Sequence, residues 1–211
     1  MSTLVLWSGG VDSTAALLHC LRELDEPVHV LYIESKTDAG RWEAENLAVK
    51  KCRVWLETNE RPFTFHTATL DVRGMIHGPN VEGIPHYGIA AMLADELVDV
   101  MRICVGWCAE DLAPTKEFES SIRWLLESIT GYLRDSTRDG IELFLPLASM
   151  GKIEQYKYVG EELAALVWGC RTPVEVGDGF EECGGCVWCK QKAALRKGEH
   201  YDLYGSPRTI P

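Results

Sequence analysis

The chain has 211 residues, of which 46% are hydrophobic, and a formal net charge of -11. This length and composition suit one α/β domain, alone or with a small appendage, and exclude a disordered tail. No apolar run reaches the ~18 residues of a membrane span and no secretory leader pattern is present, so we expect a cytoplasmic protein without membrane contacts. The acidic balance makes a nucleic-acid partner unlikely, because such a surface needs clustered Lys and Arg. The basic residues of 190–197 are interpreted as a solvated helix face.

Short apolar runs alternate with helical stretches along the chain. The expected strands are 4–7, 28–33, 63–70, 101–106 and 141–145, and the expected helices are 13–24, 41–56, 88–98, about 118–129 and 152–166. Parallel strands need crossover connections, so this order indicates a doubly wound, Rossmann-like α/β fold with a parallel five-stranded sheet. Ligands of such sheets bind at the carboxyl ends of the strands. The Gly- and Pro-rich segment 73–85 is therefore expected to be an active-site loop.

The segment between the first expected strand and helix reads Ser-Gly-Gly-Val-Asp-Ser-Thr. Adjacent glycines let the backbone turn tightly and bring N–H groups close to an anion, and the following helix adds its dipole. The residues predicted to bind phosphate here are Ser8, Gly9, Gly10, Asp12, Ser13 and Thr14. The alternative is an ordinary turn in which the glycines are merely flexible and Asp12 caps the helix.

Eight cysteines in a cytoplasmic chain point to metal binding or catalysis rather than to disulfides. Cys20, Cys52 and Cys104 fall within apolar stretches and are expected to be small buried hydrophobic residues. Cys108 lies near the expected site, where it is either a nucleophile or a packing residue. No neighbouring base is evident, which favours packing.

The remaining cysteines, Cys170, Cys183, Cys186 and Cys189, follow the spacing C-x12-C-x2-C-x2-C. Four thiolates at such spacing predict a tetrahedral structural zinc site. An iron–sulfur cluster uses the same ligand type and stays an alternative, as do four unrelated thiols. We divide the chain into a nucleotide-binding domain, residues 1–168, and a small C-terminal zinc-binding segment with the four cysteines, residues 169–211, that the metal tethers to the sheet.

The glycine loop resembles the SGGxDS signature of the PP-loop ATP pyrophosphatases, which cleave ATP between the α and β phosphates and form an adenylate. The glycine loop near the start and the four cysteines near the end together resemble the 7-cyano-7-deazaguanine synthase family. The resemblance covers nearly the whole chain. The other matching positions, in chain order, are Gly106, Asp111, Glu117, Phe118, Pro146, Leu147, Lys152 and Trp168. Trp168-Gly169-Cys170 stands where the family has Trp-Ser-Cys.

The resemblance implies that ATP adenylates 7-carboxy-7-deazaguanine and that ammonia then converts this adenylate to an amide. A second adenylation, of the amide, would give the nitrile. It implies Mg²⁺ beside ATP, structural Zn²⁺ at the cysteines, and a homodimer. Asp12, Asp111 and Lys152 would be catalytic, and Gly106 would join the loop in binding pyrophosphate. Lys152 would bring positive charge to the phosphates or to a developing oxyanion; a solvated lysine at a helix start is the alternative.

Besides the longer spacing between Cys170 and Cys183, two segments near the expected acceptor depart from the family pattern. His86 and Tyr87 stand where the family has Arg-Asn, and residues 113–116 are a shortened form of its segment before Glu-Phe. His86, Tyr87, Glu117 and Phe118 are the candidate substrate residues, although His86 and Tyr87 are equally compatible with packing. The resemblance is therefore stronger for the residues expected to bind ATP than for those expected to bind the acceptor substrate. Four alternatives remain. The protein could be an enzyme that stops at the amide, an enzyme with another carboxylate or macromolecular acceptor, a tRNA-modifying enzyme, or a non-catalytic nucleotide-binding module.

Overall fold

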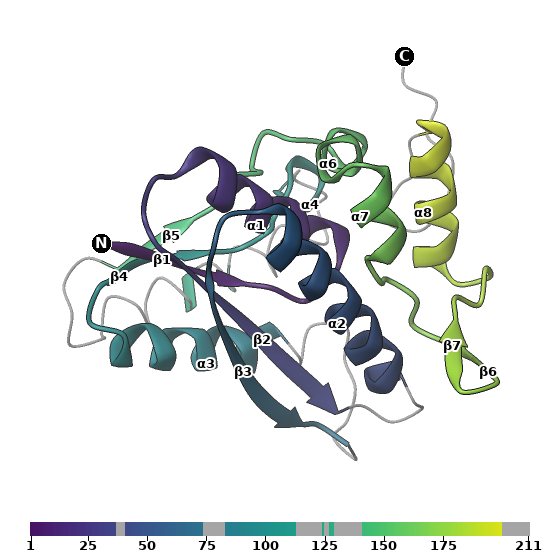
Figure 1. Ribbon diagram of the computed structural model, residues 1–211, viewed down its shortest axis with the longest axis horizontal. Coiled ribbons are helices and arrows are strands. Elements are labelled where there is room, and N and C mark those ends of the chain that lie inside the picture. Colours follow the sequence, from purple (N-terminus) through teal and green to yellow (C-terminus); the bar gives the residue numbers. More distant parts are fainter. Residues whose placement is uncertain (37–40, 74–82, 113–123, 125–126, 129–140, 200–211) are drawn as a thin grey trace.

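The structure is a computed structural model that describes residues 1–36, 41–73, 83–112, 124, 127–128 and 141–199 (Figure 1). The strands are β1 (Ser2–Leu6), β2 (Val28–Lys36), β3 (Thr64–Asp71), β4 (Val100–Cys104), β5 (Glu142–Phe144), β6 (Val174–Val176) and β7 (Gly179–Glu181). The helices are α1 (Val11–Glu23), α2 (Arg41–Asn59), α3 (Gly83–Glu96), α4 (Ala109–Leu112), α6 (Lys152–Val159), α7 (Glu161–Leu166) and α8 (Val187–Lys197).

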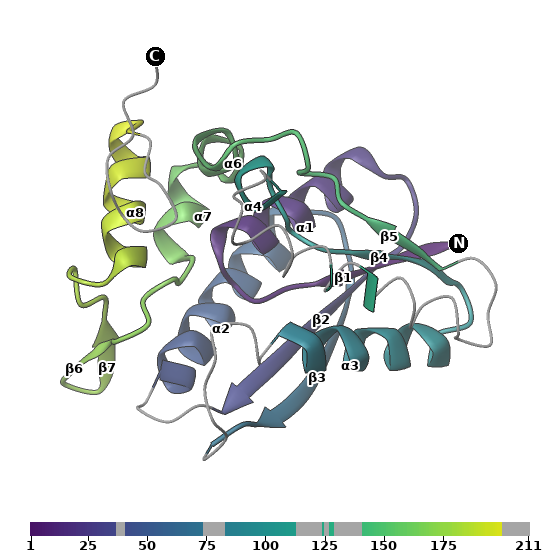
Figure 2. The same cartoon turned by 180° about the vertical axis from the view of Figure 1, so that it is seen from behind.

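Five strands form one parallel sheet in the order β3-β2-β1-β4-β5. Successive side chains of a strand point to opposite faces, so each strand of a sheet covered on both sides supplies two cores. In β1 and just after it, Val5 and Trp7 belong to one core, while Leu4 belongs to the other. Helices α1 and α2 cover the first face and α3 covers the second (Figures 1 and 2). The predicted α/β fold is confirmed.

The C-terminal part of the chain continues the first helical layer. Helix α6 packs on α1, α7 packs on α2, and α8 packs on α6. The short antiparallel hairpin β6-β7 precedes α8 and reaches α2 (Figure 1). Helix α7 ends at Leu166, close to the expected domain boundary at residues 168/169. The division into two domains stays a prediction.

Two expected helices differ from those observed. The stretch 152–166 is divided into α6 and α7 at Gly160, whose φ of 80° ends the first helix in a conformation that favours glycine. Helix α3 begins at Gly83 rather than at Gly88, because Pro85 lies in its first turn, where no intrahelical N–H bond is required. The expected helix at about 118–129 and most of the loop 73–85 lie outside the described residues. In the part of the chain that is described, no helix combines the length and apolar character needed to cross a membrane.

Candidate functional site

The candidate site lies where the strand order reverses. The chain continues from β1 to its neighbour β2 on one side, and β4 pairs with β1 on the other. In open parallel sheets the crevice beyond the carboxyl ends of two such strands is the usual ligand site. The glycine loop follows β1 and the segment Gly106–Asp111 follows β4, so both predicted segments meet at this point.

The first glycine of the loop is required by its conformation and by its surroundings. Gly9 has a φ of 76°, and a Cβ atom added there would lie 2.6 Å from Cγ2 of Val49 in α2. Gly10 adopts an extended conformation directly before α1. The glycine pair thus lets the loop turn sharply beneath α2, as the sequence pattern predicts.

Serine hydroxyls hold the loop in shape. Ser13 Oγ accepts a hydrogen bond from the backbone N–H of Ser8 at 3.1 Å, lies 3.0 Å from Ser8 Oγ and is 3.2 Å from the carbonyl oxygen of Gly10. Thr14 is fully buried and its hydroxyl accepts a hydrogen bond from Trp7 Nε1 at 3.0 Å. Thr14 therefore anchors the helix to the core, whereas Ser8, Gly10 and Asp12 line the cavity in front of the loop.

The N-terminus of α1 is suited to an anion. Gly10 is its N-cap residue and no side chain caps the helix in the described structure. The first N–H groups of a helix lack intrahelical partners and carry the positive end of its dipole. Asp12, which the alternative interpretation made a cap, instead directs its carboxylate toward Lys152.

Lys152, the first residue of α6, joins the loop to the segment after β4. Its Nζ lies 2.7 Å from Asp12 Oδ2 and 3.4 Å from Asp111 Oδ2. Its backbone N–H donates to Glu110 Oε1 at 2.9 Å. The three residues predicted to be catalytic, Asp12, Asp111 and Lys152, are therefore in contact, although they come from three different helices.

The charges of this cluster are unbalanced. Burial alone lowers the pKa of the Lys152 ammonium, but attraction to Asp12 and Asp111 outweighs burial and raises the pKa, so the lysine is charged. Burial raises the pKa of the Asp12 carboxyl; Lys152 opposes that shift, and repulsion from Asp111 and Glu110 adds to it. Among the described residues, Oδ1 of Asp12 is buried and has no hydrogen-bond partner. One lysine thus lies beside the carboxyl groups of Asp12, Asp111 and Glu110. A bound cation would reduce the repulsion among these carboxyl groups.

Cys108 is a structural residue of this cluster. Its side chain is fully buried, and both its backbone N–H and its thiol donate to Asp111 Oδ2, at 3.1 and 3.0 Å. Burial raises the pKa of the thiol to about 12, which leaves it protonated. The thiol is therefore a poor nucleophile and fixes the orientation of Asp111, in agreement with the packing interpretation.

Gly106 brings β4 against the start of α1. A Cβ atom added to it would lie 2.7 Å from backbone atoms of Asp12 and Ser13. This is a close approach of two backbones, which only glycine permits. The structure thus places Gly106 behind the loop, where it sets the position of the predicted phosphate site.

The loop and Lys152 face a cavity of about 480 Å³, a size common for small-molecule sites. His86 and Tyr87, both in α3, line it together with Trp107. His86 Nε2 is 2.6 Å from Ser35 Oγ, and the rings of Tyr87 and Trp107 meet edge to face at 6.0 Å. Burial raises the pKa of the Tyr87 hydroxyl to about 12. Glu117 and Phe118, the other predicted substrate residues, lie outside the described residues.

The C-terminal segment forms another wall of the same cavity. The backbone N–H of Trp168 donates to the carbonyl oxygen of Gly9 at 3.1 Å, which ties this segment directly to the glycine loop. Arg171, Trp188 and Lys192 also line the cavity. Sequence reasoning did not assign these three residues to the site. The sequence places two of them next to predicted metal ligands: Arg171 follows Cys170 and Trp188 precedes Cys189. This adjacency is the sequence feature that could have pointed to them.

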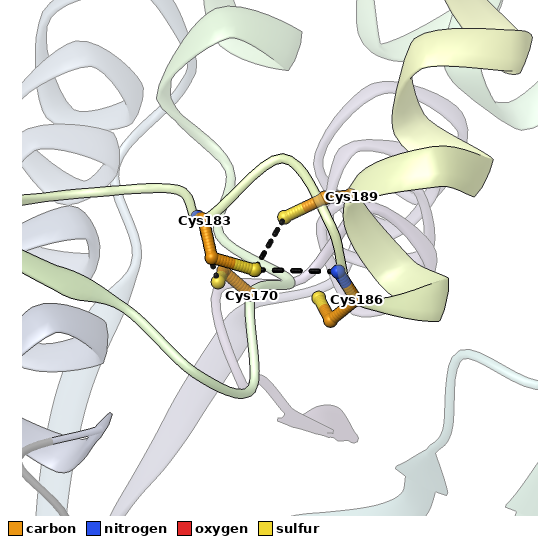
Figure 3. A group of neighbouring side chains, drawn as sticks. All are labelled: Cys170, Cys183, Cys186 and Cys189. Atoms are coloured by element: carbon orange, nitrogen blue, oxygen red, sulfur yellow. Dashed lines mark hydrogen bonds between the residues drawn. The ribbon is translucent and has the colours of Figure 1, made fainter.

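The four predicted metal-ligand thiols converge (Figure 3). Their sulfur atoms all lie within 4.8 Å of one another, with Cys183 Sγ 3.9 Å from Cys189 Sγ. The backbone N–H groups of Cys183 and Cys186 donate to the sulfur atoms of Cys170 and Cys183, both at 3.3 Å. The Thr172 hydroxyl donates to Cys183 Sγ. Together with the backbone N–H groups of Cys186 and Gly185, it lowers the pKa of the Cys183 thiol to about 6, toward the thiolate that binds metals. A C-terminal cysteine cluster able to bind a metal is therefore present, as predicted.

Comparison with known proteins gives a likeness of fold. No protein-family model and no curated protein matches the chain. Among solved structures, the U34-tRNA thiolase NcsA from Methanococcus maripaludis, which has a [4Fe-4S] cluster, matches with a TM-score of 0.53 and 13% sequence identity. The match covers 94% of this chain and 65% of the thiolase chain. A "predicted subunit of tRNA methyltransferase" from Methanocaldococcus jannaschii matches with a TM-score of 0.39 and 17% identity, over 100% of this chain and 96% of that one. The chain thus shares its α/β fold with this solved structure.

Proposed function

We propose that the chain is an ATP-dependent adenylating enzyme of the PP-loop type. The observation that carries this proposal is the meeting of the glycine loop, the uncapped N-terminus of α1 and Lys152 in one cavity at the reversal of strand order. Backbone N–H groups and a helix dipole suit the phosphates of a nucleotide. The loop itself holds no lysine, and Lys152 brings a positive charge beside it from a distant part of the chain.

The residues have distinct parts in the proposed reaction. An acceptor oxygen attacks the α-phosphorus of ATP, the bond to the bridging α–β oxygen breaks, and pyrophosphate leaves with that bonding pair. The loop N–H groups and the Lys152 ammonium stabilise the charge that gathers on the departing group, in a site that needs little reorganisation. Asp12 and Asp111 keep the lysine protonated and fix its position.

Mg²⁺ fits beside Lys152. This ion prefers carboxylate and phosphate oxygens, and Asp12 presents a buried Oδ1 without a hydrogen-bond partner among the described atoms. Asp12 is the residue that would hold Mg²⁺, whose charge would neutralise the phosphate oxygens when bound. The excess of carboxyl groups around one lysine supports this assignment.

A single zinc ion fits the four cysteines better than an iron–sulfur cluster. Zn–S bonds of about 2.3 Å in a tetrahedron place the sulfur atoms roughly 3.8 Å apart. The sulfur atoms here all lie within 4.8 Å of one another. In a four-iron cluster each thiolate binds a different iron, so the sulfur atoms lie farther apart. With four protein ligands the site has no open position, and we assign the zinc a structural role.

Two acceptors have support. The ordered matches of the sequence to the 7-cyano-7-deazaguanine synthase family favour 7-carboxy-7-deazaguanine with ammonia, which would give the amide and then the nitrile. The likeness of fold to a tRNA thiolase favours a tRNA base instead. The net charge of -11 opposes the tRNA acceptor, since tRNA binding draws on clustered cations.

The test supplies ATP, Mg²⁺ and ammonium with either 7-carboxy-7-deazaguanine or bulk tRNA, and follows AMP, pyrophosphate and product masses. Formation of AMP together with amide or nitrile supports the deazaguanine acceptor, and an amide without nitrile identifies an enzyme that stops halfway. If AMP forms only with tRNA, the protein is a tRNA-modifying enzyme instead. If neither acceptor yields AMP and pyrophosphate, both acceptor assignments are wrong, and a protein that also fails to bind an ATP analogue is not an adenylating enzyme.

A further inference from the structure

Arg171 and Trp188 form a pair at the cavity wall that the adenylation chemistry leaves unused. The guanidinium carbon of Arg171 lies 5.3 Å from the centre of the Trp188 ring, and both side chains line the cavity that also contains Ser8, Asp12 and Lys152. Trp188 is 39% exposed although it is a large apolar side chain. The part of the indole that the Arg171 guanidinium leaves exposed is available to a ligand ring.

The cysteine cluster determines where this pair stands. Arg171 is adjacent to Cys170 and Trp188 is adjacent to Cys189, so a metal held by the four thiols would join the two segments that carry the pair. A Cβ atom on Gly169 would lie 3.8 Å from Cβ of Trp188, which shows how closely the two segments pack. The pair is therefore set by the metal-binding segment rather than by the sheet.

The pair also has a fixed relation to the phosphate loop. The Trp168 N–H that donates to the Gly9 carbonyl belongs to the same short segment as Gly169, Cys170 and Arg171. Any ligand on Arg171 and Trp188 would therefore share the cavity with phosphates on the loop. An acceptor has to reach the α-phosphorus, so its subsite must open onto the same space as the loop.

We propose that Arg171 and Trp188 form the acceptor subsite, for a small planar heteroaromatic ring that carries a carboxylate. The indole supplies a surface on which a ring stacks, and the guanidinium supplies a forked donor for the carboxylate. This inference rests on the proposed adenylating function and assigns its acceptor class to named residues. A cavity of about 480 Å³ in a strongly acidic chain suits a small molecule better than an RNA strand.

Calorimetric binding in the presence of α,β-methylene-ATP tests the subsite. The probes are 7-carboxy-7-deazaguanine and its uncharged parent 7-deazaguanine, and the variants are Trp188→Leu and Arg171→Met. Trp188→Leu is expected to weaken both probes roughly tenfold or more, because the stacking surface is lost. Arg171→Met is expected to weaken the carboxylate far more than the parent ring, because only the carboxylate uses the guanidinium.

Matched controls separate the subsite from general damage. Trp124→Leu removes another exposed tryptophan, and Arg53→Met removes an arginine of α2 that pairs with Glu57 and lies over Phe65. Both controls are expected to bind the probes as the unmodified protein does. Metal content and melting temperature, measured for every variant, show whether the cysteine cluster is intact.

Three results would overturn the subsite. The carboxylate probe could fail to bind the unmodified protein, bind equally to all variants, or keep its affinity while Trp188→Leu weakens the ATP analogue. In the last case the pair holds the adenine ring instead. The adenylating function is tested separately by binding of the ATP analogue and its dependence on Lys152, so either idea can fail without the other.

Discussion

Lys152 and Asp12 form an ion pair with a separation of 2.7 Å, although they are 140 positions apart in the sequence. The pair joins the start of α6 to the start of α1, directly beside the glycine loop. It therefore unites the phosphate site and the predicted catalytic lysine in a single unit, and it is the first target for substitution.

Replacing Lys152 with Gln is expected to reduce AMP formation from ATP by about 100-fold or more, the usual cost of removing one preorganised donor to a charged transition state. The matched control is Lys157→Gln, which removes an exposed lysine from the same helix and should leave the rate unchanged. Rates are measured at saturating ATP with a coupled pyrophosphate assay. Equal rates for the two variants would remove Lys152 from the reaction.

Gly106→Ala is expected to destabilise the protein by about 1–3 kcal/mol, because its Cβ would lie 2.7 Å from the backbone of Asp12 and Ser13, which has to move. The same shift should weaken nucleotide binding, since it displaces the loop. Gly88→Ala is the control: its Cβ meets no atom of the described residues within 4 Å, and alanine favours helix α3 by up to about 1 kcal/mol. Urea denaturation measures the free energy of unfolding of both variants. An unchanged free energy of unfolding for Gly106→Ala would contradict the close packing of Gly106 against α1.

Metal analysis is expected to give one zinc per chain. Cys186→Ser should lose the metal, because it removes one of the four converging thiols, whereas Cys108→Ala should keep the metal, since Cys108 lies in the other cluster. Chelation should lower the melting temperature and make the segment between Cys170 and Cys186 sensitive to protease. Iron with visible absorption would instead identify an iron–sulfur cluster.

The folded protein is expected to lose stability as the pH falls from about 7.5 to about 5.5. His66 Nε2 and His29 Nδ1 lie 3.0 Å apart on neighbouring strands. Partial burial and the neighbouring His29 lower the pKa of His66, while Glu96 opposes the shift, and Asp99 faces His29 from the same end of the sheet. Below the ordinary histidine pKa of about 6.5 the unfolded chain therefore binds more protons than the folded one, so acid favours unfolding.

The control for this effect is His66→Gln, which cannot take up the proton. Urea midpoints of both proteins across the pH range give the slope of stability with pH. The variant should show a flatter slope, and an identical slope in both proteins would contradict the role of the histidine pair.

The sequence by itself determined the local features. Two adjacent glycines after an apolar run predict a tight anion-binding turn, and the structure has Gly9 at a φ of 76° in that turn. The spacing of the cysteines predicts a four-thiol site, and the sulfur atoms converge. Alternation of apolar runs and helical stretches predicts the parallel sheet, which is present. These features depend on the conformation of a few consecutive residues, or on repeated patterns, so they can be derived without knowing the fold.

Only the tertiary structure decided which distant segments share the site. Helix α3 starts before Pro85, so His86 lies on a helix beside Ser35, and Gly160 divides one expected helix into two. The contact of Trp168 with Gly9 and the stacking of Arg171 on Trp188 give the cavity a wall that no local pattern marks. Such contacts follow from strand order and from the packing of helices on the sheet, which are set by the burial of the whole core rather than by spacing along the chain.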